Sequence, residues 1–333
     1  MDSAGTNLSN MPLAVVAIGR NEGERLRKCL CSVADKADVL VYVDSGSTDG
    51  SVDFAKSLGA EVVVLDTSIP FTAARARNEG MRRAQQRIPH LQWIQFVDGD
   101  CEIVDGWLER AKEFLTNTPK AAAVFGRRRE RFPNQSVYNQ LCDIEWSVSP
   151  GEVKYCGGDV MFRYSAIAEQ NGYREDLIAG EEPELCVRLR AKGWFIHCIE
   201  GEMTMHDAAM TRFSQWWRRT VRCGYAYAEG VRLHGRAPER HWVRPLKSAL
   251  AWGAILPAII AVGTFILGPT FLLVALLYPI QFLRLASKER GHLQVRCQRA
   301  FYLVLGKFAE SQGAIRHLVH VLAKRKGQLI EYK

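Results

Sequence analysis

The sequence lacks the short motifs that define the commonest nucleotide-binding enzymes. Its first apolar run leads into residues 18–23, whose glycine spacing does not match GxGxxG, and this argues against a nicotinamide or flavin enzyme. No GxxxxGK[ST] segment is present, which excludes a P-loop enzyme. The glycine- and lysine-rich loop that usually follows the first strand of a sugar nucleotidyltransferase is also missing.

Paired cysteines are absent as well. Nine cysteines occur in the chain, an odd number, and no two of them form a CxxC pair. The spacing Cys29-x-Cys31 alone is weak evidence for a zinc site. We therefore interpret the cysteines as reduced, buried thiols of a cytosolic compartment.

The start of the chain does not have the pattern of a signal peptide. Residues 1–10 are polar and carry no basic cluster, and the apolar run Leu13–Ile18 is too short for a signal core. We therefore expect the N-terminal domain to stay on the cytosolic side.

The composition is that of a folded protein of one large or two smaller domains. Of 333 residues, 47% are hydrophobic and 24% are charged, which argues against disorder. The net charge of +8 suits nucleic acid, anionic lipid or phosphorylated ligands equally well. Because the arginines concentrate near predicted ligand loops and a predicted membrane segment, we expect no nucleic-acid partner.

Short apolar runs alternate with helical patterns in the first half of the chain. The predicted strands are Leu13–Ile18, Val39–Val43, Glu61–Leu65 and Trp93–Val97, and the predicted helices are Glu22–Ala34, Ser51–Leu58 and Phe71–Gln86. This alternation predicts an α/β fold with a mostly parallel sheet and helices on both faces. Ligands bind such sheets beyond the carboxyl ends of the strands, where Asp44, Asp98 and Asp100 lie.

The pattern is less regular in the next part of the chain. We predict strands at Ala121–Phe125 and Trp194–Cys198 and a helix at Pro183–Lys192. A basic run, Arg127–Arg131, follows the first of these strands, and we predict irregular structure over residues 132–160.

A long uncharged segment begins at Ser248. It continues to Leu283 without a charged residue, which is long enough for two short membrane spans with a turn near Pro269. Lys or Arg flanks both ends, which favours a hairpin with both ends in the cytosol. A buried hairpin in the core of a soluble domain is the alternative.

A basic tail follows the uncharged segment. Between Ser287 and Lys333 it carries ten Lys or Arg against three Glu, with apolar residues at helical intervals. The pattern predicts an amphipathic helix on an anionic membrane surface, or a helix packed on the main domain.

The turn Asp98-Gly99-Asp100 is the clearest candidate for chemistry. Two carboxylates at a strand end repel each other unless a cation or a proton joins them, and oxygen ligands suit Mg²⁺ or Mn²⁺. Asp-Gly-Asp is also common in ordinary turns, so the motif alone leaves both interpretations open. Asp44 could accept hydrogen bonds from a base or a ribose, whereas Asp49 is most simply a helix cap.

Several blocks in a fixed order resemble family 2 glycosyltransferases of the GT-A fold. The resemblance extends from Val15 to about Gly230. It is carried by AIGRNEGERLRKCLCSV, VYVDSGSTDGSVDFAKSLGAEVV, ARARNEGMRRA, FVDGDC, CGGDVMFRYSAI and LIAGEEPELCVRLRAKGW. It implies a cytosolic nucleotide-sugar site, an inverting displacement and a divalent metal held at the Asp-x-Asp turn.

The resemblance implies roles for single residues on the donor side. Asp44 and Ser45 would contact the nucleotide, although many members have a second acid where this chain has Ser45. Arg77 would also contact the nucleotide, and Asp98 would reach the ribose or the metal. The block Gly157-Gly158-Asp159 would line the sugar or acceptor pocket; of it, Gly158 and Asp159 are our candidates for donor binding.

Further roles follow for the metal and the base. Asp100 would bind the metal, and His206 would complete its ligands. Glu181 and Glu182 match a block that usually reads Glu-Asp, with Glu182 at the position of the base. Both acids also suit a helix start, which is the structural alternative.

A later block partly resembles the QxxRW motif of processive synthases. Gln215 and Arg218 match it, but Arg219 replaces the final tryptophan, which argues for a non-processive enzyme. Trp216 and Trp217 are candidates for an acceptor platform or for the membrane interface, so Gln215, Trp216, Trp217 and Arg218 form our acceptor set.

Together these features predict a membrane-anchored, metal-dependent, inverting glycosyltransferase. We expect a GT-A domain at residues 1–235, a transmembrane hairpin at 246–285 and a basic amphipathic tail at 286–333. The expected substrates are a nucleoside-diphosphate sugar and a lipid-linked or polysaccharide acceptor, used at the inner (plasma) membrane with the catalytic domain in the cytoplasm. The alternatives are a sugar nucleotidyltransferase and a non-catalytic membrane protein that binds nucleotide-sugars.

Overall fold

The computed structural model describes residues 11–324, which form two compact units. The first unit contains residues 11–135 and 142–209, and the second contains residues 136–141 and 210–324. Two parts of the chain lie outside the described residues. They are residues 1–10, for which we expected no signal peptide, and residues 325–333, the end of the predicted basic tail. The domain boundaries near residues 235, 246 and 286 stay a prediction, and each unit is described here by itself.

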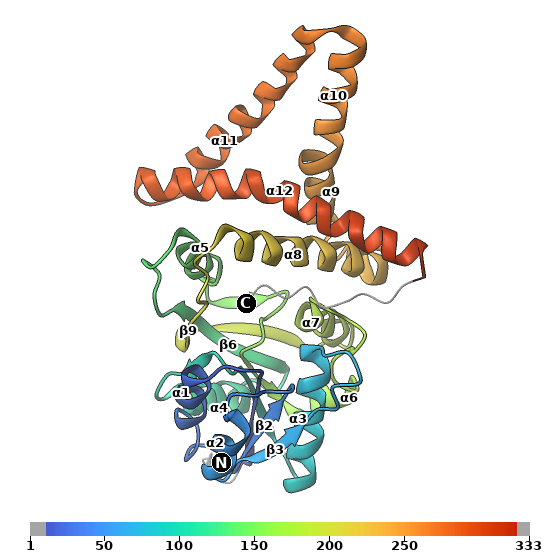
Figure 1. Cartoon of the computed structure of the whole chain (residues 1–333). Helices are drawn as coiled ribbons and strands as arrows, with labels where there is room; N and C mark the ends of the chain where they lie inside the picture. Colours follow the sequence, from blue (N-terminus) through green and yellow to red (C-terminus); the bar gives the residue numbers. More distant parts are fainter. Residues whose placement is uncertain (1–10, 325–333) are drawn as a thin grey trace, which may run out of the picture. The chain divides into compact units, whose positions relative to one another are not determined.

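A mixed sheet forms the middle of the first unit (Figure 1). Its strands lie in the order β3 (Glu61–Val64), β2 (Val39–Asp44), β1 (Leu13–Gly19), β4 (Trp93–Asp98), β8 (Val160–Arg163), β6 (Ala121–Glu130), β9 (Phe195–His206) and β5 (Cys101–Ile103), with β7 (Gly151–Val153) paired to β9. The first four strands run parallel to one another, whereas β8 is antiparallel to both of its neighbours. The predicted α/β fold class is thus confirmed, but the sheet is mixed rather than mostly parallel, because β5, β7 and β8 pair with their neighbours in the antiparallel direction.

The parallel strands align the ends that carry acids. Ile18 of β1 pairs with Val43 on one side and with Asp98 on the other, so the loops after β1, β2 and β4 meet at one edge. These strands are almost completely buried, as expected for the parallel part of a sheet covered by helices. The helix α3 (Ala73–Arg87) lies so close to β1 that a Cβ on Gly80 would be 2.2 Å from Cγ1 of Val16.

The remaining helices of this unit follow their strands in chain order. They are α1 (Glu24–Cys31), α2 (Ser51–Ser57), α4 (Trp107–Asn117), α6 (Tyr164–Glu169) and α7 (Glu181–Ala191). Their positions on the chain agree with alternation of strand and helix in the first half of the sequence.

The prediction of irregular structure over residues 132–160 is wrong in part. Helix α5 (Val137–Glu145) and strand β7 occupy much of this stretch. The predicted strand Ala121–Phe125 is also too short, because β6 continues through the basic run to Glu130 beside the long strand β9. Three consecutive arginines, Arg127–Arg129, occupy this extension, so it lacks the apolar run that predicts a strand.

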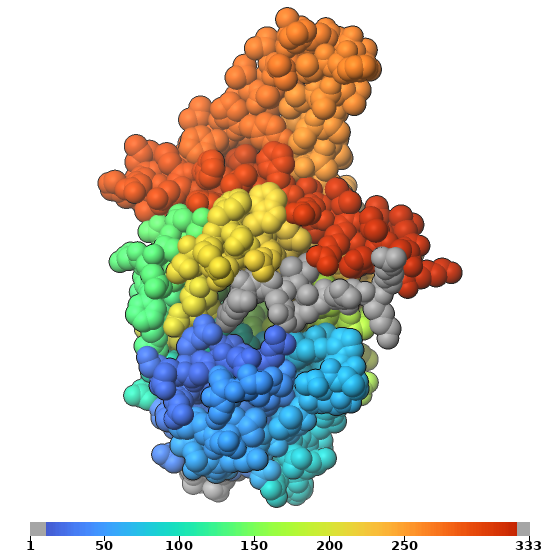
Figure 2. Space-filling model, viewed as in Figure 1, coloured from blue at the N-terminus to red at the C-terminus, as the bar shows by residue number. Residues whose placement is uncertain are grey.

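The second unit is helical. Helices α8 (Phe213–His234) and α12 (Leu293–Leu322) pack along each other through glycines, since a Cβ on Gly224 would lie 1.9 Å from the Glu310 carbonyl oxygen. The other elements are α9 (Val243–Leu250), the π-helical turn η2 (Ala251–Ile255), α10 (Leu256–Leu267), the 3₁₀ segment η3 (Pro269–Leu276) and α11 (Leu277–Lys288). Helices α10 and α11 project away from α12 (Figures 1 and 2).

The two projecting helices are long and apolar enough to cross a membrane. The candidate spans are Val243–Leu267 and Pro269–Lys288, with mean hydropathies of 2.2 and 1.6, and they are separated at Gly268 as expected. Only 0% and 6% of their apolar windows are buried within the structure. The hairpin helix of a soluble core would instead be mostly buried, so this exposure favours the membrane interpretation over the alternative.

Candidate active site

The candidate site lies at the carboxyl ends of β1, β2 and β4. Asp98 ends β4, and Gly99 then turns the chain so that its N–H donates to the Ile18 carbonyl oxygen at 2.8 Å. A Cβ on Gly99 would lie 3.0 Å from that same oxygen, so the turn is best made by glycine. As a result Asp98 and Asp100 leave the turn in different surroundings, which we call the arginine side and the imidazole side.

The arginine side is an ion-pair network around Asp98 and Arg77. Oδ1 of Asp98 accepts from Nη2 of Arg77 at 2.8 Å, and its Oδ2 accepts from Nη2 of Arg128 at 3.2 Å. Nη1 of Arg77 lies 3.0 Å from Oε1 of Glu181 and 2.9 Å from Oε1 of Glu182. One buried guanidinium therefore joins the end of β4 to the first turn of α7.

The surroundings of Glu182 raise the pKa of its carboxyl group. Its burial, and then the neighbouring Glu181 carboxylate, raise the pKa of Glu182 to about 7, and Arg77 opposes this only in part. Burial lowers the pKa of Arg77, but the carboxylates of Glu182 and Asp98 outweigh it and keep the guanidinium charged. A carboxyl group that titrates near neutral pH has the acidity that suits a general base.

The glycine and the acid of the block at residues 157–159 also belong to the arginine side. A Cβ on Gly158 would lie 2.4 Å from Nη2 of Arg77 and 2.9 Å from Oδ2 of Asp98, so only glycine fits beside this ion pair. Asp159 accepts from the Asp98 N–H at 2.9 Å and from Oγ1 of Thr204 at 2.8 Å, and Nη2 of Arg128 lies 2.8 Å away. Both residues thus shape the surroundings of Asp98, whatever they contact in a ligand.

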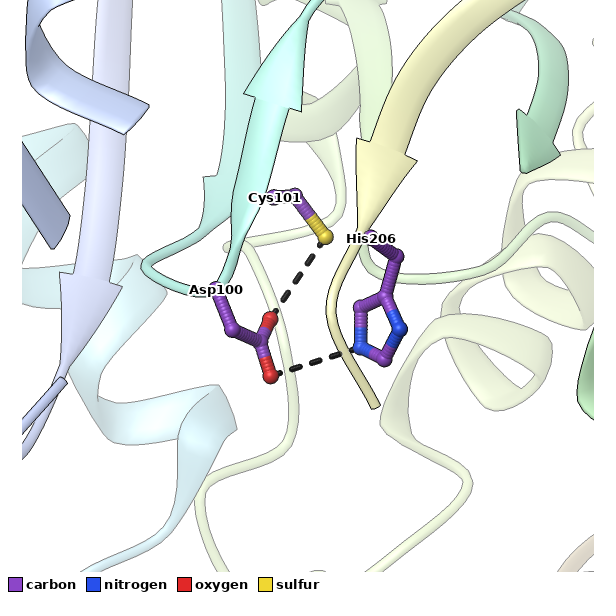
Figure 3. Close-up of side chains that lie close together, drawn as sticks. All are labelled: Asp100, Cys101 and His206. Atoms are coloured by element: carbon purple, nitrogen blue, oxygen red, sulfur yellow. Dashed lines mark hydrogen bonds and ion pairs between the residues drawn. The ribbon is translucent and has the colours of Figure 1, made fainter. Parts of the chain in front are cut away.

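The imidazole side is built around Asp100 and His206 (Figure 3). Oδ2 of Asp100 lies 3.3 Å from Nε2 of His206, and the Cys101 thiol contacts Oδ1 of Asp100 at 3.5 Å. On its other edge, His206 places Nδ1 3.3 Å from Oε2 of Glu130. The Trp146 ring packs edge to face against the imidazole, with the two ring centroids 4.6 Å apart.

Protonation on this side is set mainly by burial. Burial lowers the pKa of His206 and raises that of the Cys101 thiol, which favours a neutral imidazole and a protonated thiol. The side chains of Asp100 and His206 are only 4% and 8% exposed. The turn therefore places a carboxyl oxygen of Asp100 next to an imidazole nitrogen at a position almost excluded from solvent.

A divalent metal fits the chemistry of the imidazole side. One ligand atom from each of Asp100, Cys101 and His206 lies within 4.8 Å of the others. Carboxylate oxygen and imidazole nitrogen both suit Mn²⁺, and the carboxylate also suits Mg²⁺. Asp98 belongs to a second such group with Cys101 and Asp159, but its oxygens already face two arginines. The structure thus brings Asp100 and His206 together and places Asp98 on the other side of the turn.

The predicted nucleotide residues Asp44 and Ser45 end β2 at the same edge of the sheet. Oδ2 of Asp44 accepts from the N–H groups of Gly46 and Ser47 at 2.9 Å, and Oδ1 accepts from the Tyr42 hydroxyl. The carboxylate therefore shapes its own loop. The Ser45 hydroxyl is buried and has no hydrogen-bond partner among residues 11–324, which leaves a donor available.

The predicted acceptor residues lie in the second unit. Gln215 caps the start of α8, where its Oε1 accepts from the N–H groups of Thr211 and Arg212. Trp216 is buried against Tyr138 and Tyr302. The Trp217 indole donates to Oε1 of Gln312 at 2.9 Å, and Arg218 is exposed. The first three side chains therefore have clear structural roles, and their contact with an acceptor stays a prediction.

Arg128 and Glu130 were missed in the sequence. Both lie on β6, two residues apart, and so point to the same face of the sheet. Arg128 reaches Asp98, and Glu130 reaches His206. Their period-two spacing within the basic run was the signal that could have identified them, had that run been recognised as strand.

Comparison with known proteins identifies a family model and a solved structure that this chain resembles. Residues 15–158 match the model of the family described as glycosyl transferase family 2. The fold resembles that of a mannosyltransferase from Pyrobaculum calidifontis solved with GDP-Man and Mn²⁺, with a TM-score of 0.63, 18% identity, and coverage of 93% of this chain and 88% of that one.

Curated relatives match over a shorter stretch. A TPR repeat-containing protein of Synechococcus elongatus is 30% identical over 41% of this chain and 32% of its own length. The glycosyltransferase AglE of Haloferax volcanii is 33% identical over 33% of this chain and 38% of its own length. The chain thus spans about a third of the length of these relatives.

Fold and site together define an α/β domain of the GT-A type. Residues 15–158 of this unit match the family 2 glycosyltransferase model, and the resemblance stated from the sequence is thereby confirmed.

Proposed function

We propose that the protein is a metal-dependent, inverting glycosyltransferase that uses a nucleoside-diphosphate sugar. The observation that carries the proposal is the convergence of Asp100 with His206 and of Glu182 with Arg77 on either side of one turn. Such a site combines ligands for a divalent cation with a carboxyl group poised near neutral pH. The family match of residues 15–158 supports glycosyl transfer as the reaction.

The residues would divide the work between the two sides of the turn. Asp100 and His206 would hold Mn²⁺ or Mg²⁺, which when bound supplies positive charge to the departing diphosphate. Glu182 would accept the proton of the acceptor hydroxyl as the anomeric carbon is attacked, with Glu181 tuning it. The wall beside the donor would be formed by Arg77, Asp98, Gly158 and Asp159.

The donor is proposed to be a nucleoside-diphosphate sugar. Support comes from the mannosyltransferase of similar fold, which was solved with GDP-Man and Mn²⁺. Asp44 would order the loop against the nucleotide, and the unpartnered hydroxyl of Ser45 would donate to it. These roles extend the sequence prediction for both residues.

The second unit is proposed to hold the enzyme on a membrane and to favour a lipid-linked or polysaccharide acceptor. Residues 210–324 contain seventeen Lys or Arg against four Glu, which suits anionic lipid headgroups. The exposed, apolar α10 and α11 would insert in the bilayer, with the catalytic unit on the cytoplasmic side. On α12, Ile315, Leu318, Val319 and Leu322 are exposed at helical spacing and would lie at the interface.

The test begins with a thermal-shift screen of nucleotide-sugars in Mn²⁺, since a bound donor raises the apparent Tm. The stabilising donor is then labelled in its sugar and incubated with membranes. Transfer or hydrolysis that is lost in Asp100→Ala and in Glu182→Gln supports the proposal. Binding without turnover would favour the non-catalytic alternative, and formation of a nucleotide-sugar from a nucleoside triphosphate would favour the nucleotidyltransferase.

A further inference from the structure

A buried carboxylate, Glu130, lies behind His206 and is not explained by the reaction itself. Its side chain is completely buried, at 0% exposure, at the end of β6. Strands β6 and β9 run in parallel register here, so that Glu130 and His206 are paired neighbours. Carboxylates are rarely buried completely unless their oxygens have defined partners.

Each oxygen of Glu130 has such a partner. Oε1 accepts from the Phe132 N–H at 3.1 Å, and Oε2 accepts from the Ala208 N–H at 3.1 Å. Oε2 also lies 3.3 Å from Nδ1 of His206. Glu130 therefore ties together the segments that follow β6 and β9 and contacts one nitrogen of the imidazole.

Each ring nitrogen of His206 lies 3.3 Å from a carboxylate oxygen, Nδ1 from that of Glu130 and Nε2 from that of Asp100. A divalent cation held between Asp100 and His206 needs the lone pair of Nε2, so the hydrogen of the neutral imidazole is then on Nδ1, where the Glu130 carboxylate accepts it. Nε2 then carries the lone pair, and Nε2 is the nitrogen that faces Asp100. The Trp146 ring packs against the imidazole and limits its rotation.

We propose that Glu130 is a positioning residue that holds His206 in the tautomer and orientation required to bind the divalent metal through Nε2. This inference rests on the proposed function, because it assumes that Asp100 and His206 bind the metal. Carboxylates behind metal-bound histidines typically contribute 10- to 100-fold to metal affinity. Glu130 touches neither the donor nor the reacting atoms in this assignment.

The test measures Mn²⁺ binding by the full-length protein without any donor or acceptor. In Glu130→Gln the amide cannot accept from all three donors, so its NH₂ group competes for Nδ1 or one N–H loses its partner. We expect Mn²⁺ to bind about 10- to 100-fold more weakly in this variant. We also expect pulsed EPR to show a weakened coupling between Mn²⁺ and the imidazole nitrogen.

Two further variants separate positioning from general stability. Glu184→Gln removes another buried carboxylate, one that pairs with Arg188, and should leave the Mn²⁺ affinity unchanged. In a His206→Ala background, Glu130→Gln should add no further loss, because the residue it positions is gone. If Glu130→Gln does not fold, Glu130→Asp, whose carboxylate is withdrawn by one methylene, takes its place with the same expected loss.

The outcomes distinguish this inference from the proposed function. Wild-type Mn²⁺ affinity and nitrogen coupling in Glu130→Gln, together with weakened binding in His206→Ala, would overturn the role of Glu130 alone. Equal losses from Glu130→Gln with and without His206 would also overturn it. Wild-type binding in His206→Ala would instead refute the proposed metal site.

Discussion

Asp98 and Asp100 are separated by one glycine, yet they belong to different chemical environments. Asp98 is held by two guanidinium groups at 2.8 and 3.2 Å, and its side chain is 29% exposed. Asp100 is almost fully buried and faces an imidazole and a thiol. The two carboxylates of an Asp-x-Asp turn are therefore not interchangeable, because the turn directs them toward different strands and helices.

The difference has a consequence for where a cation binds. A metal that approaches Asp98 competes with Arg77 and Arg128, which already neutralise that carboxylate. A metal that approaches Asp100 meets an anionic oxygen and a nearby imidazole nitrogen. We therefore expect the imidazole side to bind the metal and the arginine side to organise the fold of the site and its proton chemistry.

The difference between the two sides is tested most directly by replacing each aspartate with asparagine in turn. Asp100→Asn should abolish Mn²⁺ binding and lower kcat by roughly 10³- to 10⁵-fold, as expected when several kcal/mol of metal stabilisation are lost. Asp98→Asn should retain Mn²⁺ binding but lower stability by roughly 1–3 kcal/mol, because each arginine loses one carboxylate partner while Arg77 keeps Glu181 and Glu182 and Arg128 keeps Asp159. Calorimetric titration with Mn²⁺ and thermal unfolding measure both effects. Equal loss of Mn²⁺ affinity in the two variants would show that the sides do not differ.

The arginine side is tested next through Glu182. Glu182→Gln keeps the shape of the side chain but removes the base, so kcat should fall by roughly 10²- to 10⁴-fold with Mn²⁺ affinity unchanged. The wild-type rate should rise with pH through about 7, since the deprotonated form is the active one. The residual rate of the variant should lack this rise. A wild-type pH profile in Glu182→Gln would remove Glu182 as the base.

The sequence predicted the strands that carry the site more directly than it predicted the contacts on its two sides. The parallel strands were predicted to within a residue or two, because short runs of mostly apolar residues have a simple local pattern. Arg77, Glu182 and His206 were found only through the resemblance of whole blocks. Their roles depend on neighbours that are far apart in sequence, as in the contact of Arg77 with Glu181, 104 residues away.

Glu130 illustrates why the remaining residues of the site could not be predicted from the sequence. It lies in the basic run beyond the predicted strand Ala121–Phe125, and its partner His206 is 76 residues further along. Only the pairing of β6 with β9 brings the two together. In the same way, the unequal surroundings of Asp98 and Asp100 follow from tertiary contacts of Arg128 and His206, which no local pattern encodes.

A smaller effect should separate two adjacent glycines. In Gly158→Ala the added Cβ would lie 2.4 Å from Arg77 and 2.9 Å from Asp98, which should cost about 1–3 kcal/mol of stability as the ion pair is displaced. Gly157 has open space around its Cβ position, so Gly157→Ala is the matched control and should leave the stability unchanged. Mn²⁺ affinity should be close to wild type in both, because the change lies on the arginine side. Equal Tm values for the two variants would contradict the packing argument.

The smallest effect concerns stability and pH on the arginine side. The folded protein holds the Glu182 proton more tightly than an unfolded chain does, since the pKa is raised from 4.5 to about 7. The resulting stabilisation is complete below pH 4.5 and is lost as the pH rises to about 7. Glu182→Gln cannot lose a proton, so it should be more stable than wild type at pH 8 by on the order of 1–2 kcal/mol, and the difference should shrink toward pH 5. The test is to measure the apparent Tm of both proteins across this pH range. If the difference in Tm between Glu182→Gln and wild type does not depend on pH, the folded protein does not raise the pKa of Glu182.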